Sequence, residues 1–316
     1  MSGQGRRVSR RGLLLGGGAI VGAGALAAGA TSLAAAVETP APIPQRVPAA
    51  PRPARTPDAV STVEWVASSA RRRSVRLVIT SPAGVDRRPL PVAVGLHGLG
   101  GNALWWGDPG MRRALGVAWA SGVPPFAIAA LDGGDNYWHP FRPTDDPMRM
   151  LLEELPGWLT ARGMARQTGG LPVLASGVSM GGAGALMYAR ARADRRVPVK
   201  AVAAMSPGLF TDWSVAAKRP FAGVADWEAN DPLRFYPELA GTPTGMWCGD
   251  RDSFAPAVRR YIDLARPQYS RISPGAHTGS YYGTILPQVF AFLGQHVAPT
   301  NLPVAPVSSS ATYPHL

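Results

Sequence analysis

The sequence predicts an α/β protein: a mostly parallel, doubly wound sheet with helices on both faces and a small aromatic-rich insertion. Along the 316 residues, short apolar runs alternate with helical patterns, and this order favours parallel strands joined by crossover helices. The runs are apolar at successive positions, which is typical of strands that are covered on both faces. They span residues 91–96, 126–131, 171–175, 199–204 and 244–248, and the helical patterns include 148–162 and 182–193.

Two segments before these runs have a different pattern. Residues 62–66 and 74–80 alternate between apolar and polar side chains, which predicts an antiparallel pair of strands. Between them lies the run Arg71-Arg72-Arg73. Three consecutive positive charges at this place predict a solvated turn that joins the two strands.

The two ends of the chain differ in composition from the middle. Residues 1–37 contain Arg10-Arg11, then an uncharged stretch rich in Gly, Ala and Leu, and finally Ala34-Ala35-Ala36, as expected of a cleavable twin-arginine export signal. The stretch is also long enough for a membrane anchor, although its glycines lower its hydrophobicity. Residues 38–59 predict a Pro-rich linker and residues 298–316 a disordered tail. Residues 60–297 form the folded domain of a protein that is secreted or associated with the cell envelope.

Charge and cysteine content exclude several classes of function. The basic residues number 32 and the acidic residues 20; without the seven arginines and one glutamate of residues 1–57, 25 and 19 remain. Such a mildly basic domain does not indicate nucleic-acid binding. The spacings that bind metal ions or phosphates are absent from the sequence, so we expect no cofactor. The single cysteine, Cys248, ends an apolar run and is expected to be buried and structural.

A serine lies in a tight glycine turn between a predicted strand and a predicted helix. The pentapeptide Gly177-Val178-Ser179-Met180-Gly181 has the G-x-S-x-G pattern, in which small flanking residues allow a sharp turn that exposes the serine at the end of the sheet. By itself the pattern is weak, because glycine and serine are common in this chain. Its context predicts that Ser179 is a nucleophile.

A second glycine loop follows the predicted strand 91–96. Its sequence is His97-Gly98-Leu99-Gly100-Gly101. Acyl transfer places negative charge on the former carbonyl oxygen, and backbone N–H groups that point at this oxygen stabilise it. We expect the two donors to be Met180 and Leu99, with Gly98 as the alternative to Leu99, while His97 ties the loop down.

The base and its carboxylate partner are expected on two later loops. His277 follows a predicted last strand and precedes a final helix, and Asp252 follows the run 244–248; Asp250 is the alternative carboxylate. The carboxylate would hold the imidazole in one tautomer and stabilise the imidazolium. The chain order Ser179, Asp252, His277 is that of α/β-hydrolases and differs from the orders in chymotrypsin-like and subtilisin-like enzymes.

With these residues in place, the sequence resembles the putative-esterase family of α/β-hydrolases. The resemblance rests on His97-Gly-Leu-Gly, Gly177-Val-Ser-Met-Gly-Gly182, the acid loop 249–254 and His277 with the following Tyr281-Tyr282. This family includes S-formylglutathione hydrolase (esterase D) and the mycolyltransferases of the antigen 85 complex. The resemblance implies an α/β-hydrolase fold and action on esters or thioesters without a cofactor.

Several aromatic residues are candidates for the substrate pocket. Trp138 and His139 follow the run 126–131, and Trp105 follows the glycine loop; each either contacts substrate or packs its own loop. Residues 206–240 are rich in aromatic side chains and predict a possible lid. We therefore expect a secreted serine esterase whose partners are a small-molecule, lipid or polysaccharide ester and the twin-arginine export machinery. A cell-envelope acyltransferase of the mycolyltransferase kind and a non-catalytic envelope-binding protein on a hydrolase scaffold are the alternatives.

Overall fold

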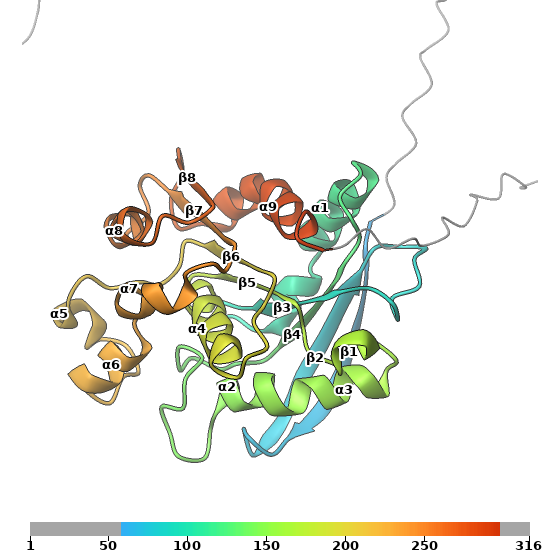
Figure 1. The fold of residues 1–316 in the computed structure, drawn as a ribbon, viewed down its shortest axis with the longest axis horizontal. Helices are drawn as coiled ribbons and strands as arrows, with labels where there is room; N and C mark the ends of the chain where they lie inside the picture. The colour runs from blue at the N-terminus through green and yellow to red at the C-terminus, as the bar shows by residue number, and fades with distance from the viewer. Residues whose placement is uncertain (1–57, 298–316) are drawn as a thin grey trace, which may run out of the picture. The chain divides into compact units, whose positions relative to one another are not determined.

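The computed structural model describes residues 58–297, which build an eight-stranded sheet with helices on both faces (Figure 1). The strand order is β1-β2-β4-β3-β5-β6-β7-β8, and the six strands from β4 to β8 in this order are parallel to one another. The predicted fold class is thus confirmed. The predicted export signal (1–37), most of the predicted linker (38–59) and the predicted tail (298–316) lie outside the described residues.

The first two strands form the predicted antiparallel pair. β1 (Val60–Ser68) pairs with β2 (Arg73–Ser81), and β2 also runs antiparallel to β4. The prediction of a solvated turn between them is wrong for one of its three arginines. Arg72 and Arg73 are exposed, but Arg71 is only 2 % exposed, because it is paired with a carboxylate on a distant loop.

The remaining strands carry the loops on which the candidate residues lie. They are β3 (Val92–Leu96), β4 (Ala127–Leu131), β5 (Leu174–Val178), β6 (Ala201–Met205), β7 (Thr244–Gly249) and β8 (Tyr269–Ser273). Every residue of the five strands β3 to β7 is buried, as expected for a sheet covered on both faces. In such sheets, functional groups gather beyond the carboxyl ends of the strands.

Two layers of helices cover the sheet (Figure 1). On one face lie α1 (Pro109–Ala120) and α9 (Gly279–Gly294), with the short helix η1 (Ala103–Gly107), and their apolar side chains form one core cluster. On the other face, α4 (Met180–Asp194) and α8 (Ala255–Ala265) join the second cluster. A continuous helical stretch belongs to this second layer and consists of α2 (Pro147–Arg149), a π-helical segment η2 (Met150–Glu154) and α3 (Leu155–Ala161).

Short helices fill the segment between β6 and β7. They are α5 (Trp213–Ala216), α6 (Val224–Asn230), α7 (Pro232–Phe235) and η4 (Tyr236–Leu239), and the 3₁₀ turn η3 (Arg166–Thr168) precedes β5. Cys248 is buried in β7 as expected, and burial raises the pKa of its thiol to about 12. Within residues 58–297, no helix has the length and apolar character needed to cross a membrane.

Candidate active site

Ser179 lies on a strained turn between β5 and α4. Its backbone angles are φ 57° and ψ −121°, a region that non-glycine residues rarely adopt and that costs about 1–3 kcal/mol. The flanking glycines make this turn possible, since a Cβ on Gly177 would collide with the carbonyl of Gly181, and a Cβ on Gly181 with the carbonyl of Leu96. The turn leaves Ser179 partly accessible to solvent although its neighbours are buried.

The structure brings Ser179 together with His277 and Asp252. The Nε2 atom of His277 lies 2.9 Å from Oγ of Ser179, and its Nδ1 atom lies 2.8 Å from Oδ2 of Asp252. Asp250, the alternative carboxylate, instead accepts a hydrogen bond from the N–H of Gly275 at 3.0 Å and is partly exposed. Of the two acids, Asp252 is therefore the one that contacts the imidazole.

The environment of Asp252 keeps this carboxylate ionised. Its side chain is fully buried, and burial alone would raise its pKa. The hydrogen bonds from His277 and from the N–H of Phe254 outweigh burial, so the pKa of Asp252 lies below its ordinary value. An ionised carboxylate has no proton to donate, so it accepts a hydrogen bond from Nδ1 of His277, and that nitrogen therefore carries a proton. The other ring nitrogen, Nε2, faces Oγ of Ser179, where a base is needed.

The loop after β3 lies beside Ser179. A Cβ on Gly98 would be 3.2 Å from Cβ of Ser179 and 3.8 Å from its Oγ. Within residues 58–297, the N–H groups of Leu99 and Met180 donate to no other protein group. Unpaired N–H groups next to a serine Oγ are what the stabilisation of an oxyanion requires.

His97 fixes this loop from behind. It is 1 % exposed, and its Nε2 atom accepts a hydrogen bond from the N–H of Gly133 at 2.8 Å. Because an N–H can only donate, the ring proton is on Nδ1, which donates to the carbonyl of Gly98 at 2.8 Å. Burial lowers the pKa of His97 and so keeps the imidazole neutral. The sequence-based expectation that His97 ties the loop down agrees with these contacts.

Trp138 and His139 pack against neighbouring residues, and the small hollow of about 160 Å³ that they border has none of Ser179, Asp252 and His277 in its lining. Trp138 is fully buried; its ring leaves no room for a side chain at Gly133 or Gly184, and its Nε1 donates to the carbonyl of His97 at 3.2 Å. His139 is 1 % exposed and stacks on Phe221. Of the two alternatives stated from the sequence, packing is therefore the one that the structure supports, and the candidate substrate contacts Trp138 and His139 are corrected, because neighbouring side chains cover both.

Comparison with known proteins places this geometry in a family. Residues 68–255, more than half of the chain, match the family described as Putative esterase. The chain belongs to the putative esterase family. It is therefore a serine hydrolase of the ester-hydrolase class, as the sequence predicted. The matched range contains Ser179 and Asp252, and His277 follows it. No curated protein matches the sequence.

Solved structures share the fold of this esterase. A ferulic acid esterase is 19 % identical, with a TM-score of 0.61 over 76 % of this chain and 98 % of the other. S-formylglutathione hydrolase from Agrobacterium tumefaciens is 18 % identical, with a TM-score of 0.60 over 78 % and 98 % of the two chains. MPT51 from Mycobacterium tuberculosis is also 18 % identical, with a TM-score of 0.55 over 73 % and 99 %.

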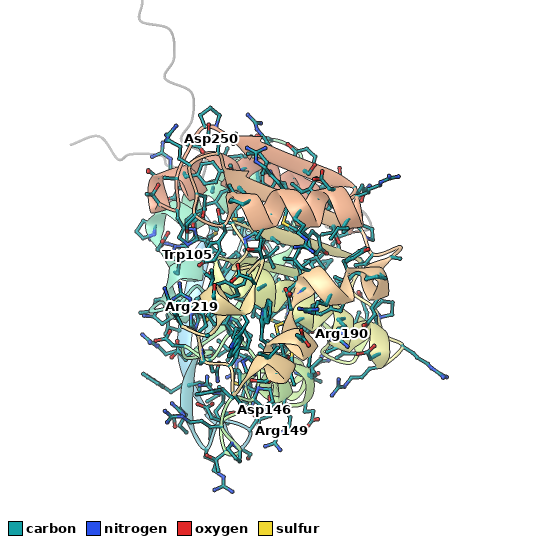
Figure 2. All side chains as sticks on the ribbon, turned by 90° about the vertical axis from the view of Figure 1, so that its left-hand side faces the viewer. Trp105, Asp146, Arg149, Arg190, Arg219 and Asp250 are labelled. Atoms are coloured by element: carbon teal, nitrogen blue, oxygen red, sulfur yellow. The ribbon has the colours of Figure 1, made fainter. Side chains whose placement is uncertain are left out.

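An apolar groove of this esterase lies between α1 and α9, close to His277. Its volume is about 400 Å³, and Trp105, Met111 and Tyr282 contribute to its walls. The ring of Tyr282 lies between the groove and the imidazole, with centroids 5.7 Å from His277 and 6.4 Å from Trp105. Figure 2 looks at the side of the molecule that carries Trp105 and Asp250. A larger hollow of about 660 Å³ includes Thr244 at the beginning of β7. It lies at the amino ends of the strands, whereas Ser179 lies at their carboxyl ends.

The segment between β6 and β7 of the esterase reaches the site through rings that pack edge to face. Phe210 contacts Phe254, which in turn lies 5.3 Å from the ring of His277. Sequence reasoning did not assign a role to Phe254 or to Tyr282, although both flank the imidazole. Their closeness to Asp252 and His277 in the sequence was the available signal. Phe210 and Trp227 are buried, so the segment packs firmly onto the domain.

Proposed function

We propose that this protein is a secreted esterase that hydrolyses carboxylic esters through Ser179, His277 and Asp252. The observation that carries the proposal is the continuous line of hydrogen bonds from Ser179 Oγ through the imidazole to Asp252, at 2.9 and 2.8 Å. It lies at the carboxyl ends of parallel strands. Among residues 58–297, the N–H groups of Met180, which follows Ser179, and of Leu99, which follows the nearby Gly98, donate to no protein group. This is a complete set of groups for acyl transfer.

Each group has one task in the proposed reaction. His277 Nε2 removes the proton of Ser179 as Oγ attacks the ester carbonyl, and Asp252 stabilises the imidazolium. The N–H groups of Met180 and Leu99 bind the oxyanion, each lowering the barrier by about 3 kcal/mol. His277 then gives its proton to the departing alcohol, and water releases the acid from the acyl-enzyme.

The groove between α1 and α9 supports an ester with an apolar alcohol part. Its wall residue Tyr282 contacts His277, and the departing alcohol leaves on the side of the group that protonates it. Trp105, partly exposed at the groove, would then contact the alcohol part of the substrate. The segment 206–240 acts as a cover on the other side of the imidazole.

Export is part of the proposal and rests on residues 1–37, with their Arg10-Arg11 pair and uncharged stretch. A twin-arginine route carries folded proteins, which suits a chain with one cysteine and therefore no internal disulfide. Detection of the mature protein in culture medium, and its retention in the cell after Arg10→Lys with Arg11→Lys, would test this part.

The test of the chemistry combines a covalent probe with ester hydrolysis. A fluorophosphonate probe is expected to label the full chain at Ser179, and Ser179→Ala is expected to abolish labelling and the burst of p-nitrophenol while leaving the circular dichroism spectrum unchanged. A folded wild-type protein that is not labelled would instead support a non-catalytic binding role.

The same assay separates hydrolysis from acyl transfer. The wild-type protein is given p-nitrophenyl esters from acetate to palmitate, with and without a sugar acceptor. Free acid as the only acyl product supports the esterase. Acyl-sugar formation, or labelling with little hydrolysis, would assign the same site to an acyltransferase of the cell envelope.

A further inference from the structure

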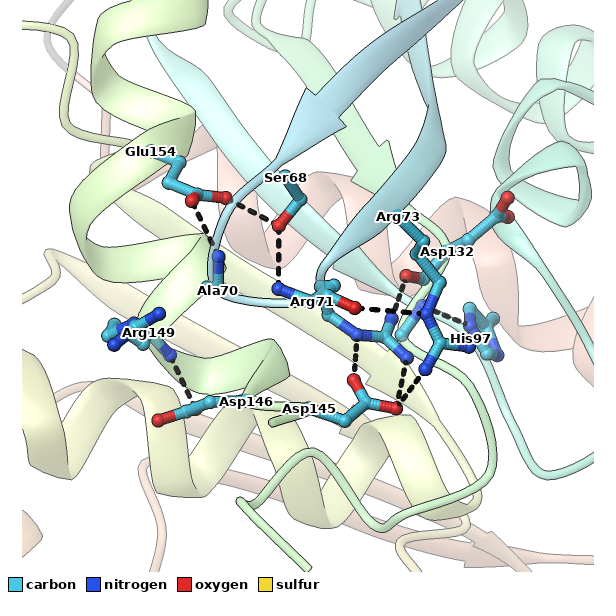
Figure 3. A network of polar contacts seen from close by, with 11 residues as sticks. Ser68, Ala70, Arg71, Arg73, His97, Asp132, Asp145, Asp146, Arg149 and Glu154 are labelled. Carbon is cyan, nitrogen blue, oxygen red and sulfur yellow. Dashed lines mark hydrogen bonds and ion pairs between the residues drawn. The ribbon is translucent and has the colours of Figure 1, made fainter. Parts of the chain in front are cut away.

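A buried arginine that the proposed reaction does not use lies behind the oxyanion loop. Arg71 is 2 % exposed. Its Nε and Nη2 atoms donate to the carboxylate of Asp145, and its Nη1 donates to the backbone carbonyl of Asp132 (Figure 3). Burying a guanidinium costs free energy unless it is paired and hydrogen-bonded. Here every guanidinium nitrogen has a protein acceptor.

The loops around Arg71 are built to hold the guanidinium. Asp145 also binds Arg73 at 2.6 Å. Gly134 has φ +67°, and a Cβ there would lie 2.8 Å from Nη2 of Arg71. A side chain at position 134 would therefore displace the arginine. Glu154 holds the preceding turn by accepting from Ser68 Oγ at 2.6 Å and from a backbone N–H (Figure 3).

The carbonyl that Arg71 binds belongs to the peptide group whose N–H binds His97. The C=O of Asp132 and the N–H of Gly133 are the two ends of one planar peptide. Arg71 holds the oxygen end, and Nε2 of His97 accepts from the nitrogen end at 2.8 Å. A positive charge at the oxygen polarises the peptide and makes its N–H a stronger donor.

The same relation recurs on the other side of His97. Its Nδ1–H donates to the carbonyl of Gly98 at 2.8 Å, and this oxygen also accepts from the N–H of Gly101 at 3.0 Å. The N–H of that peptide group is the N–H of Leu99. Because the peptide is trans, this N–H points away from the donors that hold the carbonyl. Hydrogen bonds to the Gly98 oxygen therefore fix the direction of the Leu99 N–H.

We infer that Arg71, anchored by Asp145, is a positioning residue that aims and polarises the Leu99 N–H through two peptide groups and His97. The path runs from the guanidinium to the Asp132–Gly133 peptide, to the imidazole, to the Gly98–Leu99 peptide, and ends beside Ser179. Arg71 touches neither substrate nor the reacting atoms. The inference rests on the proposed function, since Leu99 must be an oxyanion donor for Arg71 to affect the rate.

The experiment compares an ester with its thiono analogue, in which sulfur replaces the carbonyl oxygen. Sulfur accepts hydrogen bonds poorly, so a loss that acts through the oxyanion donors affects the ester far more than the thionoester. For Arg71→Lys in the full chain, kcat for p-nitrophenyl acetate is expected to fall about 10–100-fold, with KM changed less than about twofold. For the thionoester, kcat is expected to fall less than about threefold.

A matched arginine serves as control. Arg192 is 3 % exposed and donates to the carbonyl of Pro172 at 2.5 Å and to Tyr188 Oη at 2.8 Å, near the end of α4. Arg192→Lys is expected to lower stability without changing the ratio of ester to thionoester rates. Where Arg71→Lys does not fold, Asp145→Asn removes the negative charge and one of the two acceptor oxygens that anchor Arg71, and it is expected to lower the ratio of ester to thionoester rates by about 3–10-fold.

The outcomes separate the two levels of the proposal. The role of Arg71 is overturned if a folded Arg71→Lys or Asp145→Asn variant has an unchanged ratio of ester to thionoester rates, or if this ratio falls equally in Arg192→Lys. In either case, labelling of the wild-type protein at Ser179 would still support the esterase assignment. Absence of labelling in the wild-type protein overturns the esterase assignment itself. The proposed role of Arg71 is supported if the rate on the ester falls more than the rate on the thionoester in Arg71→Lys and Asp145→Asn but not in Arg192→Lys.

Discussion

Two histidines belong to the site, one in contact with Ser179 and one behind the loop after β3, and they are held in opposite ways. The side chain of His277 is 33 % exposed and is fixed by one carboxylate. His97 is 1 % exposed, and both of its ring nitrogens are bonded to backbone groups. The first is arranged to exchange a proton with Ser179 and a leaving group. The second is arranged to stay neutral, because burial lowers its pKa.

This difference shows how one residue type serves two tasks in one site. Proton transfer needs a ring that can take up charge and is supported by an anion, which Asp252 supplies. Stabilising an oxyanion needs donors that do not reorganise during the reaction. The loop after β3 meets this need because hydrogen bonds hold it on the side away from Ser179. The last pair in this series is the buried Arg71 with the partly buried Asp145.

The largest effect is expected on the His277 side, from Asp252→Asn. An amide leaves the wrong tautomer and removes the charge that stabilises the imidazolium, so kcat is expected to fall about 10⁴-fold with the fold intact. Steady-state hydrolysis of p-nitrophenyl acetate measures it. The matched change Asp250→Asn keeps an oxygen that can accept from the N–H of Gly275 and removes only a charge that faces the exposed Arg251, so it is expected to change kcat less than about threefold. A larger loss in Asp250→Asn than in Asp252→Asn would reverse the choice between the two acids, and equal losses would contradict the assignment of Asp252.

The next effect is expected on the His97 side, from Gly98→Ala. The added Cβ would lie 3.2 Å from Cβ of Ser179 and 3.4 Å from the carbonyl of Val178, so the loop must shift by a few tenths of an ångström. A displaced Leu99 N–H is expected to lower kcat about tenfold. Gly157→Ala, with nothing near its Cβ, is the control. Unchanged kcat in a folded Gly98→Ala would argue against this loop as an oxyanion donor.

A smaller effect is expected at the groove. Trp105→Ala removes apolar surface from its wall and is expected to lower kcat/KM about fivefold for acetates of aryl alcohols, with little change for methyl acetate. Competition between the two esters measures the selectivity directly. Trp65, which is 67 % exposed on β1, provides the control Trp65→Ala. If both acetates lose rate equally, Trp105 does not contact the alcohol part.

The smallest effect is expected in the pH dependence of stability. Burial lowers the pKa of folded His97 below its ordinary value of 6.5, so below pH 6.5 the unfolded chain binds a proton that the folded chain does not. Stability is therefore full above pH 6.5 and falls as the pH drops toward the folded pKa, by at most about 1.4 kcal/mol per pH unit for this group. His139, with its pKa also lowered by burial, acts in the same direction.

Urea unfolding between pH 7.5 and 5 measures this slope. His97→Asn is expected to have a shallower slope than the wild-type protein, whatever its absolute stability. Asp252 does not contribute in this range, because a carboxylate with a lowered pKa loses its stabilising effect only below its ordinary value of 3.8. An unchanged slope would mean that folded His97 titrates normally and is not held neutral.

Sequence reasoning reached the parts of this esterase that are local in the chain. The five apolar runs are the strands β3 to β7, with boundaries shifted by up to three residues. They could be recognised because strands that are buried on both faces consist almost entirely of apolar residues. The turn at Ser179 was predictable because its glycines are adjacent to the serine. His277 was predictable from its place after the last strand, because the carboxyl ends of parallel strands lie at the same end of the sheet.

The residues whose place the sequence did not predict, Arg71 and Trp138, have a different feature in common. Arg71 looks like its neighbours Arg72 and Arg73 in the sequence, and its burial follows from a partner 74 residues away. From the sequence, Trp138 could equally have contacted a substrate. In the structure its ring occupies the space beside Gly133 and Gly184, which have no side chains. Neither outcome follows from periodicity or from a motif, because each depends on how two loops pack against each other.

By itself, the sequence determined the strand order along the chain, the glycine turns and the set of candidate groups at strand ends, since these are properties of short segments. Only the tertiary structure decided that Asp252 rather than Asp250 contacts His277, that Arg71 is buried behind the oxyanion loop, and that Trp105 borders a groove while Trp138 fills the core. The physical reason is that burial and hydrogen-bond partners are fixed by packing between elements that are distant in the chain.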